Sequence, residues 1–244
     1  MRDNQGVSLP DGFQRGVPGA DLPPRVLAVS DEVNEALWTT SVKDVAVDLI
    51  LAAGDLPFDY LDFLASTLDR PLVFVPGNHD PDLSGFGWRN GLSLRAGFPS
   101  RWPGPPGGIN ADGRIVEVAG VRVAGLGGSP WYNGGPNQWT ERRQSRRARR
   151  LVRLARGAPV DVLLTHTPPL GVGDADGADA DRPHRGFGCL HDAVTSLRPR
   201  WLLHGHIHPY GRHPPEQRLG DTRVRNVVGA HVFGLGPLSR TEAP

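Results

Sequence analysis

The sequence of 244 residues predicts an α/β layered fold with a largely parallel central sheet. Short apolar runs have the length and continuity of strands that are buried on both faces: "RVLAVS", "VDLILAAGD", "PLVFVPGN", "VDVLLTH" and "PRWLLHGH". Segments with helical periodicity lie between several of them, and this alternation is typical of parallel sheets. Because 38% of the residues are hydrophobic, the chain can bury a sizeable core, and we expect one domain.

Helices are predicted at "PFDYLDFLASTLD", at residues 139–156 and at "FGCLHDAVTSLR". In the second helix, apolar side chains fall on one face and arginines occupy the remainder, the apolar set being Ala148, Leu151, Val152 and Ala155. We interpret the arginines as the solvated face of a surface helix rather than as a patch for nucleic acid or membrane. We therefore expect no nucleic-acid partner, and a nuclease, prompted by the arginine-rich helix, is kept as a third possibility that a steep salt dependence of DNA binding would support.

The run "RIVEVAGVRVAGL" has a different pattern, because its residues alternate around Ala119 and Gly120. This predicts an antiparallel hairpin and hence a mixed sheet or two stacked sheets. Residues 1–24 are rich in Gly, Pro and Asp without apolar periodicity, so we expect a flexible arm before a domain at 25–244. Two irregular stretches, 80–113 and 167–186, are long enough to be functional loops.

Charge and cysteine content exclude several classes of protein. The chain has 26 acidic and 27 basic residues, so its net charge favours neither nucleic acid nor an acidic substrate. Cys189 is the single cysteine and cannot form an internal disulfide, which suits a reducing compartment. No N-terminal apolar stretch resembles a signal peptide or a membrane span. We expect a cytoplasmic protein with no membrane partner.

Residues able to bind metal follow each of the predicted strands. In chain order they are Asp31, Asp55, the group Asn78, His79 and Asp80, then His166, and finally the histidines of "HGHIH" at 204–208. Ligands of open α/β sheets lie beyond the carboxyl ends of the strands. Carboxylate and imidazole ligands without cysteine suit Mn²⁺, Zn²⁺ or Fe²⁺. A carboxylate such as Asp55 can bridge two ions, which lie about 3.5–4 Å apart in two-metal sites.

The order of these pieces resembles the calcineurin-like metallophosphoesterases. The matching blocks are "GD" at 54–55, "GNHD" at 77–80, the histidine of "LLTHTPP" at 166 and "GHIH" at 205–208, within a region from about Arg25 to about Val232. The segments "LLTHTPPLG", "GCLHDAV" and "LLHGHIHPYG" look most like the small uncapped branch that includes bacterial phosphodiesterases. The resemblance implies a four-layer α/β/β/α sandwich, with two mixed β-sheets flanked by helices, and two divalent metal ions.

The resemblance also implies two sets of ligands. One ion would be held by Asp55, Asn78, His166 and His206, all of which are present. The other would be held by Asp31, Asp55, His208 and a histidine two residues after Asp31. Position 33 is a valine, which cannot bind a metal.

Three outcomes are open for the altered position. The ion binds there with fewer protein ligands, it recruits Glu32 or Asn34, or that position stays weak or empty. Strand alternation turns Glu32 away from the side that Asp31 faces, so we interpret Glu32 as a solvated or salt-bridged acid, although a loop distortion would bring it in.

The resemblance assigns catalytic roles to two more residues. His79 would be the general acid that protonates the departing alkoxide, and Asp80 is a candidate for orienting its ring. His204 precedes the motif glycine and is interpreted as structural or as a support for the metal ligands, and His184 matches no ligand position. Substrate contacts are expected from the long loops and from residues near them in sequence, namely Trp88, Arg89, Trp131 and Tyr132.

Together these features predict a metal-dependent phosphoesterase that hydrolyses phosphodiester or phosphomonoester bonds through a metal-activated hydroxide. The absence of a large inserted cap favours an open groove, and hence phosphodiesters or nucleotides over an enclosed monoester. The partner would be a small phosphoester. The alternative, prompted by Val33, is a non-catalytic or weakly active binding scaffold with an impaired first metal position.

Overall fold

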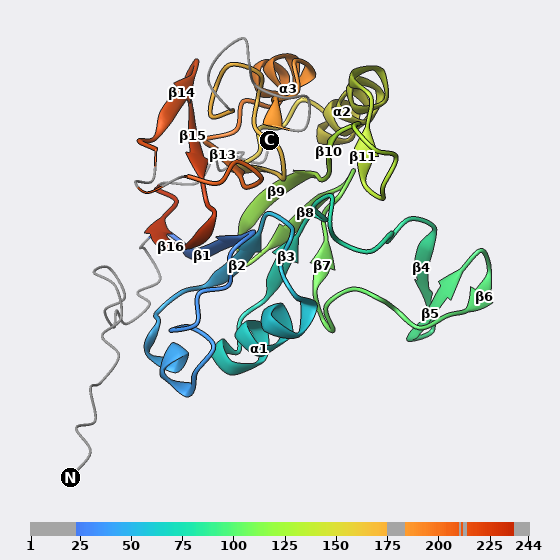
Figure 1. Cartoon of the computed structure of the whole chain (residues 1–244), viewed down its shortest axis with the longest axis vertical. Helices are drawn as coiled ribbons and strands as arrows, with labels where there is room; N and C mark the ends of the chain where they lie inside the picture. Colours follow the sequence, from blue (N-terminus) through green and yellow to red (C-terminus); the bar gives the residue numbers. More distant parts are fainter. Residues whose placement is uncertain (1–22, 175–183, 210, 212–213, 237–244) are drawn as a thin grey trace, which may run out of the picture.

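The structure is a computed structural model that describes residues 23–174, 184–209, 211 and 214–236. Two large sheets are stacked on each other, and helices cover their outer faces (Figure 1). This is the predicted four-layer α/β/β/α sandwich, so the fold class is confirmed. Residues 1–22 of the predicted flexible arm lie outside the described residues, and the first strand begins at Arg25.

The first sheet has the strand order β16-β1-β2-β3-β7. Its strands are β1 (Arg25–Ser30), β2 (Leu49–Ala52), β3 (Leu72–Phe74), β7 (Ile109–Asn110) and β16 (Gly229–Gly234). All neighbours pair in parallel except β16, which runs antiparallel to β1. Helix α1 (Phe58–Leu68) and the short 3₁₀ helix η1 (Thr40–Asp44) contribute to an apolar cluster with this sheet. The parallel pairing brings the ends of β1, β2 and β3 to one edge of the sheet.

The second sheet has the order β14-β15-β13-β12-β9-β8 and is also mixed. Its strands are β8 (Ile115–Val118), β9 (Val121–Leu126), β12 (Val162–Thr165), β13 (Trp201–His204), β14 (Gln217–Leu219) and β15 (Thr222–Asn226). The predicted hairpin is confirmed, since β8 and β9 pair antiparallel with Val118 opposite Val121. Both turn residues have positive φ, 51° at Ala119 and 73° at Gly120, as the tight hairpin turn requires.

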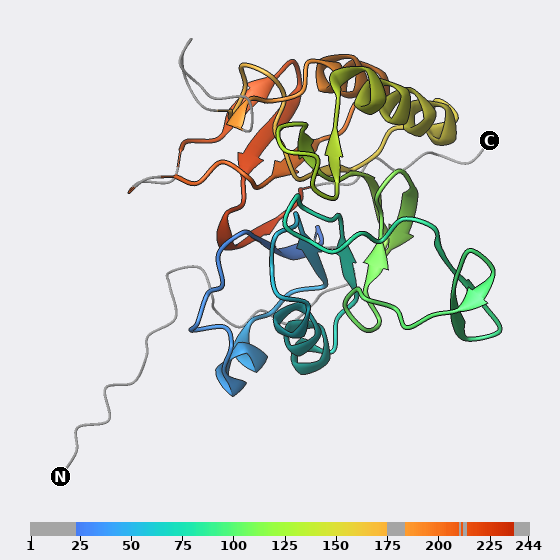
Figure 2. The same ribbon diagram turned by 45° about the vertical axis from the view of Figure 1, so that its right-hand side comes forward.

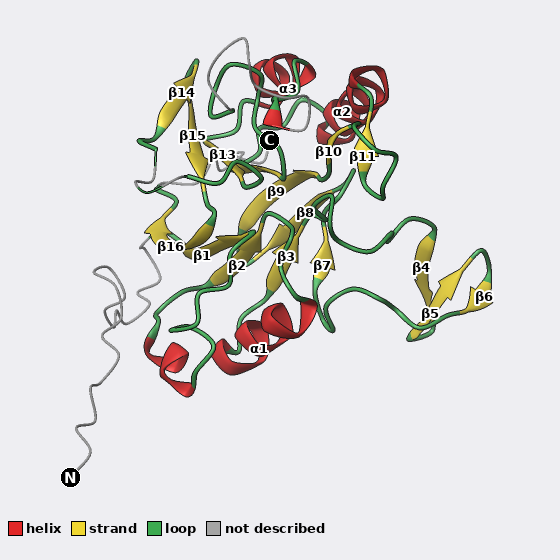
Figure 3. Ribbon diagram, in the orientation of Figure 1, coloured by secondary structure: helices red, strands yellow, loops and turns green. Residues whose placement is uncertain are grey.

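Helices α2 (Glu141–Ala155) and α3 (Cys189–Leu197) cover the outer face of the second sheet. Figure 3 shows the helices in the outer layers and the main strands between them. In α2, Ala148, Leu151 and Ala155 are buried against the sheet and Val152 packs beside them, as predicted. Most of the arginines of this helix are exposed.

A continuous apolar core lies between the two sheets. It combines residues of β1, β2 and β3 with residues of β9, β12 and β13, and Trp201 is the largest fully buried side chain. The indole Nε1 of Trp201 donates to the carbonyl of Leu235 at 3.0 Å, so burial leaves its polar atom paired. This core fixes the two sheets against each other, and therefore fixes the strand ends that bear the site.

The interpretation of residues 80–113 as an irregular loop is wrong. This stretch contains β7 and a three-stranded antiparallel sheet of β4 (Phe86–Arg89), β5 (Leu92–Arg95) and β6 (Phe98–Pro99). The small sheet stands away from the two main sheets (Figures 1 and 2). Its strands are short and mostly exposed, with Phe98 at 73% exposure, so they lack the buried runs by which the other strands are recognised.

Further short strands also escaped prediction. The pair β10 (Ser129–Pro130) and β11 (Gln138–Trp139) forms its own two-stranded sheet, and β14, β15 and β16 extend the edges of the main sheets. Among the described residues, no helix is long and apolar enough to cross a membrane.

Candidate metal centre

The chain turns sharply where β1 and β2 end. Asp31 and Asp55 both have φ near 57°, a left-handed conformation that is uncommon for a residue with a side chain. At Asp31 the turn is closed by a bond from the Glu32 amide to the Ser30 carbonyl at 2.6 Å. His206 lies in a similar three-residue turn, with φ of 66° and a bond from Ile207 N to Gly205 O at 2.8 Å. Such strained turns are typical of functional sites.

Three of the predicted ligands form a compact buried group. Ligand atoms of Asp55, His166 and His206 all lie within 4.8 Å of one another. The rings of His166 and His206 lie 4.8 Å apart between centroids. Asn78 completes this group, because its Oδ1 lies 3.1 Å from His166 Nε2.

The hydrogen bonds of His166 show why this group requires a cation. Its Nδ1 lies 2.8 Å from the carbonyl of Ala53, and a carbonyl can only accept, so Nδ1 bears the proton. In the neutral ring, Nε2 then presents a lone pair to Asp55 Oδ2 at 3.2 Å and to Asn78 Oδ1 at 3.1 Å. Acceptors that converge in this way need a positive charge between them, either a proton or a metal ion.

The pKa shifts express the same requirement. Burial alone lowers the pKa of His166, but the hydrogen bond and charge of Asp55 and the charge of Asp31 outweigh it and raise the pKa to about 9. Burial alone raises the pKa of Asp55, but the hydrogen bond and charge of His166 leave it below its ordinary value. A metal-free centre therefore holds a proton at His166, and a divalent cation can take its place.

Asp31 lies beside the same centre. Its Oδ2 accepts hydrogen bonds from Ser30 Oγ and from the backbone amide of His206, the latter at 2.9 Å. Its Oδ1 lies 3.8 Å from His208 Nε2. Burial raises the pKa of Asp31 despite the nearby charge of His166 and these hydrogen bonds. The structure thus brings Asp31 and His208 together, as the second set of ligands requires.

Two motif glycines are needed for these close approaches. A side chain at Gly77 would overlap Asp55 Oδ1, and one at Gly205 would overlap Ser30 Oγ and Asp31 Oδ2. Glycine is therefore required at both positions for steric reasons.

His79 and Asp80 differ in their surroundings. The ring of His79 is exposed, and its backbone amide donates to Asp55 Oδ1 at 2.8 Å. Asp80 is buried, and its Oδ2 accepts from the amides of Gly77 at 2.7 Å and Asp55 at 3.0 Å. Burial raises the pKa of Asp80 to about 6. These contacts join two site loops, and the orientation of the His79 ring by Asp80 stays a prediction.

Asn137 fastens the segment between β10 and β11 to the "GNHD" loop, a contact that the sequence did not predict. The side-chain nitrogen of Asn137 donates to the carbonyls of Gly77 at 2.9 Å and Asp80 at 3.0 Å. In the same segment the hydroxyl of Tyr132 accepts from the Nδ2 of Asn78 at 3.3 Å. Tyr132 therefore lies beside a predicted metal ligand, whereas Arg89 belongs to the separate small sheet. The side chain of Trp88 lies outside the described residues.

Two further histidines surround the group. The ring of His184, which the sequence left outside the ligand set, lies 5.7 Å from that of His206 between centroids and is exposed. His204 is buried, with Nδ1 3.0 Å from the carbonyl of Gly205. Burial lowers the pKa of His204 to about 4, in keeping with a structural residue.

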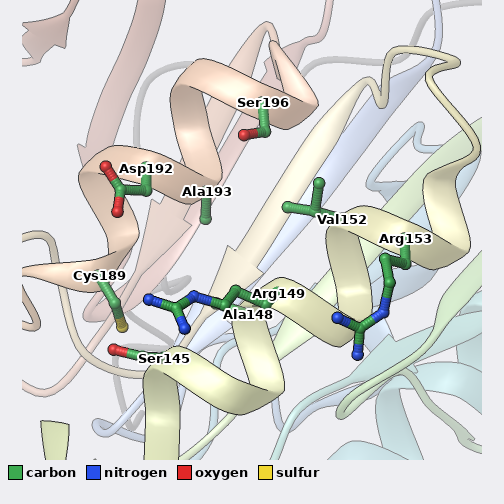
Figure 4. Close-up of a pocket in the computed structure, with 9 residues that line it drawn as sticks. All are labelled: Ser145, Ala148, Arg149, Val152, Arg153, Cys189, Asp192, Ala193 and Ser196. Atoms are coloured by element: carbon green, nitrogen blue, oxygen red, sulfur yellow. The ribbon is translucent and has the colours of Figure 1, made fainter. Parts of the chain in front are cut away.

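A pocket of about 270 Å³ opens elsewhere, between α2 and α3 (Figure 4). It is lined by Ser145, Ala148, Arg149, Val152, Arg153, Cys189, Asp192, Ala193 and Ser196. None of the predicted site residues lines it, so it is separate from the metal centre.

Comparison with known proteins agrees with this geometry. The family model described as calcineurin-like phosphoesterase matches residues 27–210. None of the curated proteins matches the chain significantly. Among solved structures, one crystal structure aligns with a TM-score of 0.57 and 14% identity, covering 88% of this chain and 100% of the other.

Two more solved structures are similar. The protein TT1561 of Thermus thermophilus has a TM-score of 0.57 and 15% identity, with 87% of this chain and 99% of the other covered. The purple acid phosphatase PPD1 from yellow lupin seeds has a TM-score of 0.41 and 15% identity, with 86% and 45% covered. At 14% and 15% identity, the likeness to the first two structures shows the fold alone.

Proposed function

Since the chain belongs to the calcineurin-like phosphoesterase family, we propose that it is a metal-dependent hydrolase of small phosphodiesters. The proposal rests above all on the converging lone pairs of His166, Asp55 and Asn78, which need a cation between them. Nucleotides that contain a phosphodiester are among the candidate substrates.

The donor atoms fit divalent cations. One ion would be held by Asp55, Asn78, His166 and His206, and the other by Asp31, Asp55 and His208. Oxygen and imidazole donors without thiolate suit Mn²⁺, Fe²⁺ or Zn²⁺. When bound, such ions supply positive charge to the phosphoryl oxygens and make water a better nucleophile near neutral pH.

The protein's own residues have separable roles in this proposal. Asp55 orders the site, because Oδ2 faces His166 at 3.2 Å while Oδ1 accepts from the amide of His79 at 2.8 Å. That contact holds the backbone of His79 beside the centre and leaves its ring exposed, where it can donate a proton to the leaving oxygen. Tyr132 holds the side-chain amide of Asn78, so that Oδ1 stays directed at the centre.

Exposure around the centre supports a diester over an enclosed monoester. The side chain of His208 is 45% exposed, and His79 is exposed as well. An open rim has room for two ester substituents on one phosphorus atom.

The first experiment combines Mn²⁺ titration by calorimetry with hydrolysis of bis(4-nitrophenyl) phosphate and of 4-nitrophenyl phosphate. We expect metal-dependent turnover that is faster for the diester. Faster turnover of the monoester would overturn the diester assignment, and no turnover of either compound with any divalent ion would overturn the hydrolase.

The second experiment tests the general acid. His79→Ala should leave both metals bound and lower kcat by about 10²-fold or more, because proton transfer to the leaving group is lost. The loss should be larger for an ester of phenol than for one of 4-nitrophenol, since the better leaving group needs less protonation. An equal loss for both esters would show that His79 is not the acid. Asp55→Ala, in contrast, should abolish metal binding at both positions.

A further inference from the structure

The two residues that follow Glu32 do not supply the ligand that is missing from the first metal position. Val33 is partly buried and packs against the apolar cluster formed by β1, β2, α1 and the segment that includes Leu37 and Val42. The Oδ1 of Asn34 accepts from the amide of Ala36 at 3.1 Å, which is a local turn contact.

Glu32 is directed back toward the site, and the expectation that it faces away is wrong. That expectation extended the alternation of β1 past Ser30, whereas the strand ends there and the chain reverses at Asp31, with φ of 57°. As a result Glu32 Oε1 lies 2.9 Å from His208 Nδ1.

This contact determines which nitrogen of His208 faces the centre. A carboxylate accepts, so Nδ1 is the donor and bears the proton. The lone pair then lies on Nε2, the atom that is 3.8 Å from Asp31 Oδ1. Histidines that bind metals commonly donate their other ring nitrogen to a carboxylate, which fixes the tautomer and the orientation of the ring.

We propose that Glu32 is a positioning residue for the first metal position. It holds His208 in the orientation and tautomer that suit metal binding, and so compensates for the histidine that is absent at position 33. This inference rests on the proposed metal-dependent function and names a residue that supports one of its two metal positions. The side chains of Glu32 and His208 are 57% and 45% exposed, so the hydrogen bond between them contributes little to folding. Removal of Glu32 is therefore a clean test, because the fold does not depend on it.

The test measures metal binding separately from turnover. Mn²⁺ affinities are measured by calorimetry, and paired Mn²⁺ ions are detected by the spin-coupled signal in electron paramagnetic resonance. The parent, Glu32→Ala, Glu32→Gln and Glu35→Ala are compared, and thermal unfolding checks each fold. Glu35→Ala is the matched control, since it removes an equally charged, exposed acid three residues further along.

For Glu32→Ala we expect the weaker Mn²⁺ affinity to fall about 10- to 100-fold and the tighter affinity to stay unchanged. The spin-coupled signal should be lost at a Mn²⁺ concentration that just fills both positions of the parent. Glu32→Gln keeps an acceptor oxygen and should lose less than Glu32→Ala. Glu35→Ala should bind like the parent.

Three results would overturn the proposal. They are parental binding of both ions by Glu32→Ala, an equal loss in Glu35→Ala, and a parent that binds a single ion. Failure of the proposed function looks different, since a parent that binds two ions yet hydrolyses neither ester leaves the role of Glu32 in metal binding intact.

Discussion

Asn137→Gly tests whether the contact between two loops holds the site together. Asn137 has φ of 54° and donates from Nδ2 to the carbonyls of Gly77 and Asp80. Glycine adopts this φ without strain, so the substitution removes the side-chain hydrogen bonds and leaves the backbone conformation accessible.

The magnitude follows from the bonds that are lost. The two shorter bonds, at 2.9 and 3.0 Å, each contribute about 1 kcal/mol to stability in a typical protein site. Because the site is partly exposed, hydrogen bonds to water replace part of this contribution when the side chain is removed. We expect Asn137→Gly to lower the free energy of unfolding by about 1 to 2 kcal/mol. Asn137→Ala should lower it by about 1 kcal/mol more than loss of the bonds alone, because alanine is strained at positive φ.

Urea unfolding measures the stability, with Asn90→Gly as the matched control. Asn90 also has positive φ, 49°, and is exposed in the turn between β4 and β5, so its replacement should change the unfolding free energy by less than about 0.5 kcal/mol. Because Asn137 supports the loop that bears Asn78, kcat/KM for the diester should also fall about tenfold. Equal unfolding midpoints for Asn137→Gly and Asn90→Gly would refute the reasoning.

Three more predictions concern residues around the site and in the helices. Val33→His should lower the free energy of unfolding by about 1 to 2 kcal/mol, because it places an imidazole against an apolar cluster. Calorimetry should show no additional Mn²⁺ ion. An additional ion would show that position 33 reaches the site. Burial raises the pKa of Cys189 to about 12 from an ordinary 9.0. Between these two values the thiol of the unfolded chain ionises while that of the folded protein stays neutral, so the free energy of unfolding falls as the pH rises through this range. Alkylation of folded protein at pH 8 should be at least about 100-fold slower than that of unfolded protein, and equal rates would contradict the burial. Arg147→Lys should lower the free energy of unfolding by about 1 to 2 kcal/mol. The Nη2 of Arg147 contacts both oxygens of Asp112 while Nη1 donates to the carbonyl of Gly127 and to Gln144, and the single nitrogen of lysine cannot make all of these contacts. Lysine also stacks less well on Trp139, whose ring centre lies 4.3 Å from the guanidinium. A parental midpoint in thermal or urea unfolding would contradict this.

Much of the fold could be predicted because its signals are local. The buried strands of the two sheets are continuous apolar runs, and the turn at Ala119 and Gly120 interrupts a clear alternation. The strands of the small sheet gave no such signal, because most of their side chains face solvent, as Phe98 does. Burial, rather than β-structure itself, is what makes a strand visible in a sequence.

The sequence by itself determined which residues have side chains able to bind metal and that they follow buried strands, since ligand chemistry belongs to the side chain and parallel strands end at one edge. Only the tertiary structure decided how these residues cooperate. Glu32 reaches His208, 176 positions further along the chain, because the backbone reverses at Asp31. Asn137 reaches Gly77 across 60 positions because two loops pack together. Such contacts depend on backbone angles at strand ends and on how the sheets stack, and neither quantity has a local pattern in the sequence.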